Sequence, residues 1–167
     1  DKALPILQRA LGNSPDSVRV KDALAAVTYD AEFWADDVER LTEEAGGKDD
    51  AQAVRMLLRA ARILRIEAPD DPRLEALVKK ILAKDIEEPS ANFIYETILA
   101  NGSRWDELEE HQRRRADRAP DHTAKVAAFR TFALEWVQRF KDKDRGAKFF
   151  DAALKTQASN GAAPMRS

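Results

Sequence analysis

An internal repeat constrains the fold of this chain more than any other feature of its sequence. Trp34 corresponds to Trp105 and Ala45 to Ala116 at a spacing of about 71 residues. Further along the spacing becomes about 72 residues, and the matched pairs are Val54 and Val126, Leu57 and Phe129, Ala61 and Ala133, Leu64 and Trp136, Leu77 and Phe149, and Leu82 and Leu154. Such a period is typical of repeat architectures, in which each unit buries its apolar face against its neighbours.

The apolar residues recur at helical spacing along the whole chain, and no stretch alternates as a strand would. Prolines, glycines and capping residues predict about nine helices, roughly four in each half, at 2–11, 17–29, 30–45, 50–67, 71–84, 89–100, 103–119, 121–141 and 144–158. Ser103 is the expected cap of its helix, with Asp106 three residues later. We expect one domain at 1–158, made of about four helix pairs after a leading half-repeat, and a disordered tail at 159–167.

Small and aromatic residues in the last helix predict a tight helix contact. Gly146, Phe150 and Ala153 share one helical face, and small residues there allow two backbones to approach closely. Trp105 and Trp136 are interpreted in the same way, as packing residues and not as a ligand site.

Three segments carry a resemblance to the tetratricopeptide repeat (TPR) family, which the chain resembles over nearly its whole length as a degenerate bacterial member. They are Ala3, Leu7, Ala10 and Pro15; Trp105, Leu108 and Pro120; and Gly146, Phe150 and Ala153. Leu74, Val78, Ile81 and Arg115 depart from the family's pattern. The resemblance implies an all-α, right-handed α-α superhelix of antiparallel pairs, whose first helices line a concave surface. A closed helical bundle and other helical-pair solenoids remain open.

Composition narrows the classes of partner. The chain is 44% hydrophobic and 35% charged, which suits amphipathic helices, and its net charge of −2 predicts no nucleic-acid partner. No cysteine is present for a disulfide or a thiolate metal site, and no apolar run reaches the length of a membrane span. The chain begins with Asp1 and not with Met, so we expect an excised fragment of a larger protein or a processed protein, and we assign no compartment.

The sequence predicts no catalytic, cofactor or metal site. His111 lies among glutamates and is interpreted as a solvated surface residue, and His122 as a first-turn residue. Adjacent acidic residues do not converge on a helix, which argues against paired-carboxylate chemistry. The basic run at 113–115 with Arg118 is interpreted as favourable charge late in a helix, in preference to a phosphate-binding patch.

The predicted function is a non-catalytic interaction or scaffold module that binds a protein or peptide. If first helices line a concave face, the candidate partner-binding residues are Arg55, Arg59, Arg62, Phe93, Thr97, Thr131, Glu135 and Gln138. An outer solvated face is the competing interpretation of the three arginines. Two other functions stay open, namely the docking or regulatory arm of a larger enzyme and a structural or oligomerisation spacer.

Overall fold

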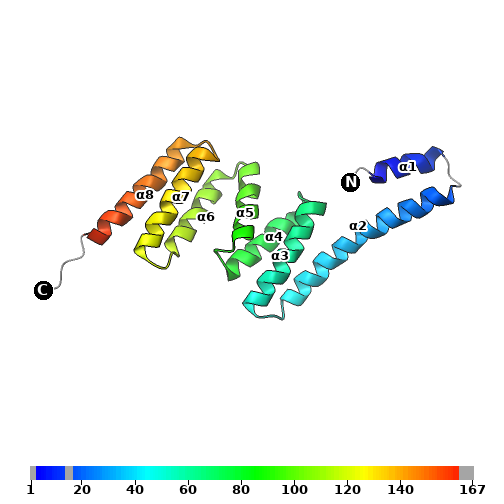
Figure 1. The fold of residues 1–167 in the computed structure, drawn as a ribbon, viewed down its shortest axis with the longest axis horizontal. Coiled ribbons are helices and arrows are strands. Elements are labelled where there is room, and N and C mark those ends of the chain that lie inside the picture. Colours follow the sequence, from blue (N-terminus) through cyan, green and yellow to red (C-terminus); the bar gives the residue numbers. More distant parts are fainter. Residues whose placement is uncertain (1–2, 14–16, 162–167) are drawn as a thin grey trace. The chain divides into compact units, whose positions relative to one another are not determined.

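In a computed structural model, every described element of the chain is an α-helix (Figure 1). The structure describes the backbone of residues 3–13 and 17–161, and the side chains of 5–13, 17–24 and 33–159. The helices are α1 (Ala3–Asn13), α2 (Val18–Ala45), α3 (Asp50–Glu67), α4 (Pro72–Lys84), α5 (Pro89–Asn101), α6 (Trp105–Asp117), α7 (His122–Gln138) and α8 (Lys143–Gly161). The all-α class is therefore confirmed.

The helices pack in chain order within two compact units, residues 1–91 and residues 92–167. In the first unit α1 contacts α2, α2 contacts α3 and α3 contacts α4; in the second α6 contacts α7 and α7 contacts α8. Short connections such as 68–71 and 139–142 make consecutive helices reverse direction (Figure 1). The extent of one repeat domain over 1–158 stays a prediction.

Two helices expected at 17–29 and 30–45 form one continuous helix, α2. The expected boundary lies at Asp30, a residue type that often caps helices, but an aspartate inside a helix costs well under about 1 kcal/mol and does not break it. Neither glycine nor proline occurs between Val18 and Ala45, and the helix ends where Gly46 follows. The end of α8 also differs, because it reaches Gly161 and not residue 158. The rest of the expected tail, and Pro15, lie outside the described residues.

Aspartate side chains cap several of the described helices. The side chains of Asp49, Asp71 and Asp121 each accept a hydrogen bond from a backbone N–H in the first turn that follows. The expected cap at Ser103 is wrong. Its backbone lies in the left-handed region at φ 54°, Arg104 is the N-cap residue of α6, and no side chain caps that end. A reversal over so few residues required a left-handed turn, which took Ser103 out of the capping conformation.

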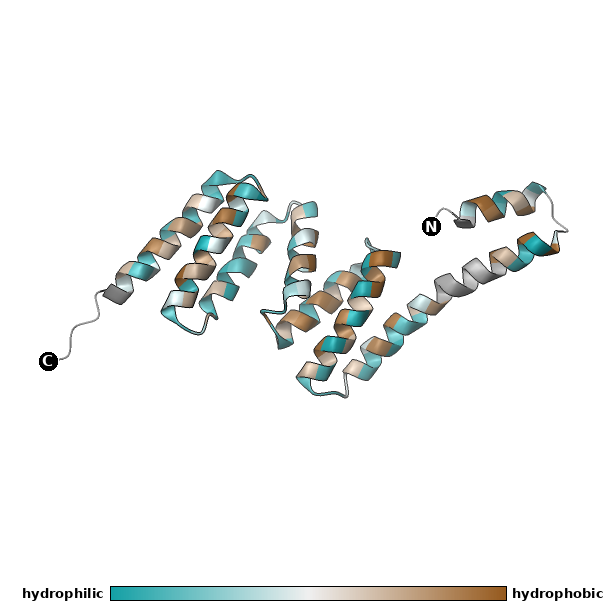
Figure 2. Cartoon of the chain, in the orientation of Figure 1, coloured by the Kyte–Doolittle hydropathy of each residue, from teal (hydrophilic) through white to brown (hydrophobic). Residues whose placement is uncertain are grey.

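The core of the first unit is aliphatic and lies where the helical stripes of α2, α3 and α4 meet. Figure 2 shows the apolar residues of these helices alternating with hydrophilic ones at helical spacing. The buried hydrophobic residues of α2, α3 and α4 are Val38, Leu41, Ala45, Ala53, Leu57, Leu58, Ala60, Ala61, Leu64, Leu74, Leu77, Val78 and Ile81. No described helix is both long enough and apolar enough to cross a membrane.

The core of the second unit is aromatic. Trp136 and Phe149 are fully buried, and their ring centroids lie 6.4 Å apart in a stacked arrangement. Phe132 meets Phe149 edge-on at 6.0 Å, and Trp105, which is half-buried, meets Trp136 edge-on at the same centroid distance. Such pairs add to the apolar area that the rings bury. Packing roles for both tryptophans are consistent with these contacts.

The tight contact predicted around Gly146 is present between α7 and α8. A Cβ atom at this glycine would lie 2.6 Å from Val137 Cγ2 and 3.1 Å from the carbonyl oxygen of Ala133. The predicted aromatic, however, is wrong: Phe149 is buried, whereas Phe150 is 39% exposed. The two rings lie on either side of the face of Gly146 and Ala153, each about 50° from its centre, so helical spacing alone did not distinguish them.

We predict that Gly146→Ala destabilises the protein by about 1–3 kcal/mol, because the added methyl group overpacks the α7–α8 contact. The matched control is Gly12→Ala in α1, where nothing lies within 4 Å of the new Cβ and the gain in helix propensity is at most about 1 kcal/mol. Urea denaturation followed by circular dichroism measures both. Equal stabilisation by the two substitutions would disprove the close contact.

Candidate partner-binding surface

His111 is buried, at 4% exposure, which corrects its interpretation as a solvated residue. Its Nε2 atom lies 2.7 Å from Asn92 Oδ1, and its ring meets Tyr95 edge-on at 5.0 Å. Burial, with smaller contributions from the positive charges of Arg115 and Arg114, lowers the pKa of His111 to about 4. The imidazole is therefore neutral at pH 7, and it joins α6 to α5. His122, the first residue of α7 as expected, contacts the backbone oxygen of Thr156 in α8.

A buried carboxylate lies at the centre of the second unit's polar contacts. Glu96 of α5 is 4% exposed, and two arginines bind it. Arg115 of α6 donates to Oε1 at 3.1 Å, and Arg139, just after α7, donates to Oε2 at 3.0 Å. Each guanidinium neutralises part of a charge that burial would otherwise make costly. The network thereby fixes α5, α6 and α7 to one another.

Glu135 of α7 lies beside this network. Gln112 of α6, which is fully buried, donates from Nε2 to Glu135 Oε2 at 3.0 Å, while its Oε1 has no hydrogen-bond partner among the described residues. Burial raises the pKa of Glu135, and the neighbouring charge of Glu96 raises it further, against the opposing effect of Arg139 and Arg115. Two carboxylates thus share two guanidiniums across three helices.

Arg139 brings two of the predicted residues together. Its Nη2 donates to Thr97 Oγ1 at 3.3 Å, and its guanidinium carbon lies 5.4 Å from the centre of the Phe93 ring. Phe93 is nevertheless 55% exposed, so one side of a large apolar ring faces solvent while a cation holds the other. We define the α5/α7 surface as Phe93, Thr97, Glu135 and Arg139.

The other predicted residues are more scattered. Thr131 and Gln138 are exposed on α7, within one turn of Glu135. The exposed residues Arg55, Arg59 and Arg62 share a face of α3, in the first unit. Sequence reasoning missed Glu96 and Arg139. A lone glutamate in the run 93–99 was the available signal for Glu96, and its partner Arg115 stands where the tetratricopeptide pattern has a small residue. No local signal marks Arg139.

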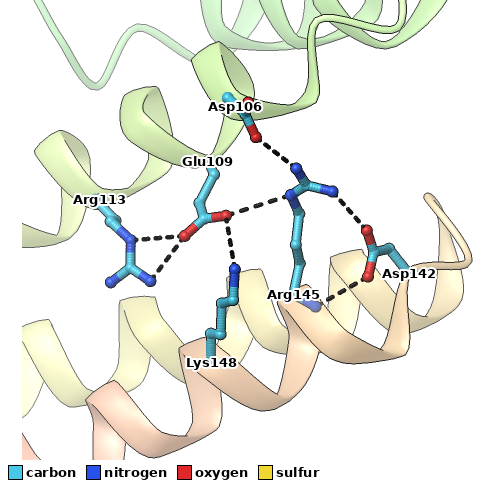
Figure 3. Close-up of polar contacts among 6 residues, drawn as sticks. All are labelled: Asp106, Glu109, Arg113, Asp142, Arg145 and Lys148. Carbon is cyan, nitrogen blue, oxygen red and sulfur yellow. Dashed lines mark hydrogen bonds and ion pairs between the residues drawn. The ribbon is translucent and has the colours of Figure 1, made fainter.

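The basic run of α6 is largely engaged in contacts within the second unit. Arg113 donates to Glu109 Oε1 at 2.9 Å, and Arg115 binds Glu96. Figure 3 shows how Glu109 and Asp106 of α6 also face Arg145 of α8, with the Arg145–Asp106 pair at 2.5 Å. Asp142 and Lys148 complete this charged cluster. These contacts support a packing role for Arg113 and Arg115 of the run.

Among the residues that the structure describes, no group of three or more histidine, aspartate or glutamate side chains is placed to hold a metal ion. Comparison of the chain with models of protein families, with curated protein sequences and with solved structures finds no match. The resemblance to tetratricopeptide repeats therefore stays a hypothesis, and the argument for function rests on the surface itself.

We predict that acid destabilises the protein through His111. Since its pKa falls from 6.5 to about 4 on folding, the unfolded chain binds the extra proton between these pH values, and stability is lost as the pH falls through that window. Between pH 7 and pH 4 the free energy of unfolding of the native protein should fall by about 3 kcal/mol more than that of the His111→Gln variant. Glutamine is chosen because it keeps a hydrogen-bond donor for Asn92. Urea denaturation across this range measures the difference. Parallel stability profiles for the two proteins would contradict a neutral buried imidazole.

We also predict that Glu96→Gln costs about 2–3 kcal/mol, because it leaves Arg115 and Arg139 without the carboxylate that they share. Glu110→Gln, at an exposed position on α6, is the control and should change stability by less than about 0.5 kcal/mol. Thermal and urea unfolding measure both variants. If they prove equally stable, Glu96 does not organise the unit.

Proposed function

We propose that this protein is a non-catalytic interaction module, a TPR-like right-handed superhelix that binds a peptide or protein through the first helices of its pairs. The observation that carries the proposal concerns Phe93. Its ring is 55% exposed, and its other side contacts Arg139, which is paired with the buried Glu96. An exposed aromatic on a rigid support is typical of interface anchors, because binding buries it with little loss of side-chain entropy.

The α5/α7 surface suits a partner with an apolar side chain next to an acidic group. Phe93 offers exposed apolar area on this surface, and Leu134 of α7 is a second exposed apolar residue, at 48%. Arg139 keeps about a third of its side chain exposed while it binds Glu96, so its guanidinium can also meet a carboxylate from outside. Thr97, Thr131 and Gln138 supply neutral polar groups around these anchors.

The arginines of α3 form a second candidate contact. Arg55, Arg59 and Arg62 follow at steps of four and three, so their exposed side chains share one face of the helix. Three guanidiniums on one face favour an acidic segment of the partner. Exposed charges at the edge of an interface act mainly on the association rate and on its salt dependence.

We predict that Phe93→Asp abolishes peptide capture without unfolding the protein. The probe is a library of displayed random peptides, selected on the full chain, whose winners should pair an apolar residue with acidic ones. Loss of the anchor should weaken the selected peptides at least about tenfold, with the melting temperature nearly unchanged, because the ring is already half in solvent.

Phe33→Asp on α2 is the matched control, since Phe33 is equally exposed at 57% and lies outside the α5/α7 surface. Titration by fluorescence anisotropy compares the three proteins. The proposal fails if no peptide is enriched, or if Phe33→Asp weakens the selected peptides as much as Phe93→Asp does. Charge reversal at Arg59 then tests the α3 contact by its effect on the association rate.

A further inference from the structure

Helix α8 has two apolar faces, and α7 covers one of them. The inner face carries Gly146, Phe149 and Ala153, which are buried. About a third of a turn around the helix, a second apolar stripe is exposed and consists of Ala147, Phe150, Leu154 and Ala158. Its members follow at steps of three, four and four, so they form one continuous seam along the helix. Phe150 is 39% exposed and Leu154 is 61% exposed.

Four exposed charges lie along one flank of this seam, and one of them, Lys148, also lies 4.0 Å from Glu109 of α6. In chain order they are Asp144, Lys148, Asp151 and Lys155. Their steps of four, three and four keep them on one side of the apolar residues, since each residue turns the helix by about 100°. The signs alternate from negative to positive along this flank.

This order of charges has a simple symmetry, because reading it backwards inverts every sign. In an antiparallel pair of identical helices related by a twofold axis, equivalent flanks meet and run in opposite directions. Asp144 then lies opposite Lys155 of the second copy, and Lys148 opposite Asp151 of the second copy. A parallel twofold pair would instead place this flank against the other border of the partner's seam, so these Asp–Lys pairs would not form.

The apolar seam obeys the same symmetry at nearly the same centre. With the axis between residues 149 and 151, the exposed side of Phe150 meets Phe150 of the second copy. Leu154 then lies opposite Ala147, so a large side chain packs over a small one, as in interdigitated helix pairs. Charge and shape therefore select one arrangement independently.

We propose that the outer face of α8 is a self-association surface, on which a second copy of this chain packs through its own α8 in the antiparallel sense. The contact is distinct from the α5/α7 surface. A pair of single helices buries less than the roughly 1,200 Å² of a standard interface, so the dimer is weak and reversible. Because exposed ion pairs choose its direction, its affinity falls as salt increases.

The experiment uses two full-length variants whose charges complement each other. The basic variant is Asp144→Lys with Asp151→Lys, and the acidic variant is Lys148→Asp with Lys155→Asp. In each, every cross-pair becomes repulsive, so self-association should weaken at least about tenfold relative to the native chain. When the two are mixed, every cross-pair is Lys opposite Asp, and a heterodimer of about native affinity should form. Sedimentation with one variant labelled measures both results.

Controls separate this contact from general attraction between opposite charges. The same mixture with Leu154→Glu in both variants should not form the heterodimer, because the seam is then charged. Circular dichroism checks that each variant is folded. The proposal is overturned if the native chain stays monomeric up to about 1 mM, if the variants self-associate like the native chain, or if Leu154→Glu leaves the heterodimer intact. If the native chain stays monomeric, the seam would not be a contact between two copies and would bind a helix of another protein instead.

Discussion

The arrangement of the second unit depends on the need to neutralise one buried carboxylate. Glu96 is nearly inaccessible to water, and an unpaired charge there would cost several kcal/mol. Its two arginines come from different helices, so α5, α6 and the end of α7 must hold one relative position for both ion pairs to form. The aromatic core supplies most of the hydrophobic stabilisation, but it tolerates small rotations of a helix. The paired charges do not, and they give the outward-facing Phe93 a fixed support.

Features that depend on local spacing were predictable from the sequence, whereas features that depend on distant partners were not. Helical periodicity, aspartate caps and the small residue at Gly146 identified most helices and the α7–α8 contact, because each signal acts within about one turn. His111 was misjudged because its neighbours in sequence are charged, while its neighbours in space are Asn92 and Tyr95 of another helix. Of the candidate surface, sequence spacing found Phe93, Thr97 and Glu135. The residue that connects the first two, Arg139, stands outside the helical pattern, and nothing local distinguishes it.

Two kinds of exposed apolar residue differ in their support, and this difference separates the two proposed contacts. Phe93 is held from below by a guanidinium in a charged network, which suits one specific anchor for a partner's side chain. Phe150 and Leu154 belong instead to a continuous stripe on a regular helix, bordered by alternating charges. An apolar stripe along a helix packs against a matching stripe on another helix, so this surface favours a helical partner. The bordering charges set the direction of that helix.

The continuity of α2 has a consequence for how the first unit opens. At about 1.5 Å per residue, its 28 residues extend about 42 Å, whereas the 18 residues of α3 extend about 27 Å. The fully buried positions identified on α2 are Val38, Leu41 and Ala45, all in its last third. Amide hydrogen exchange should therefore be graded along a single helix, slow near residue 41 and fast near residue 20. Because the helix is unbroken, a force applied to its first turns is transmitted along it to the buried residues of its last third, without a hinge to absorb it.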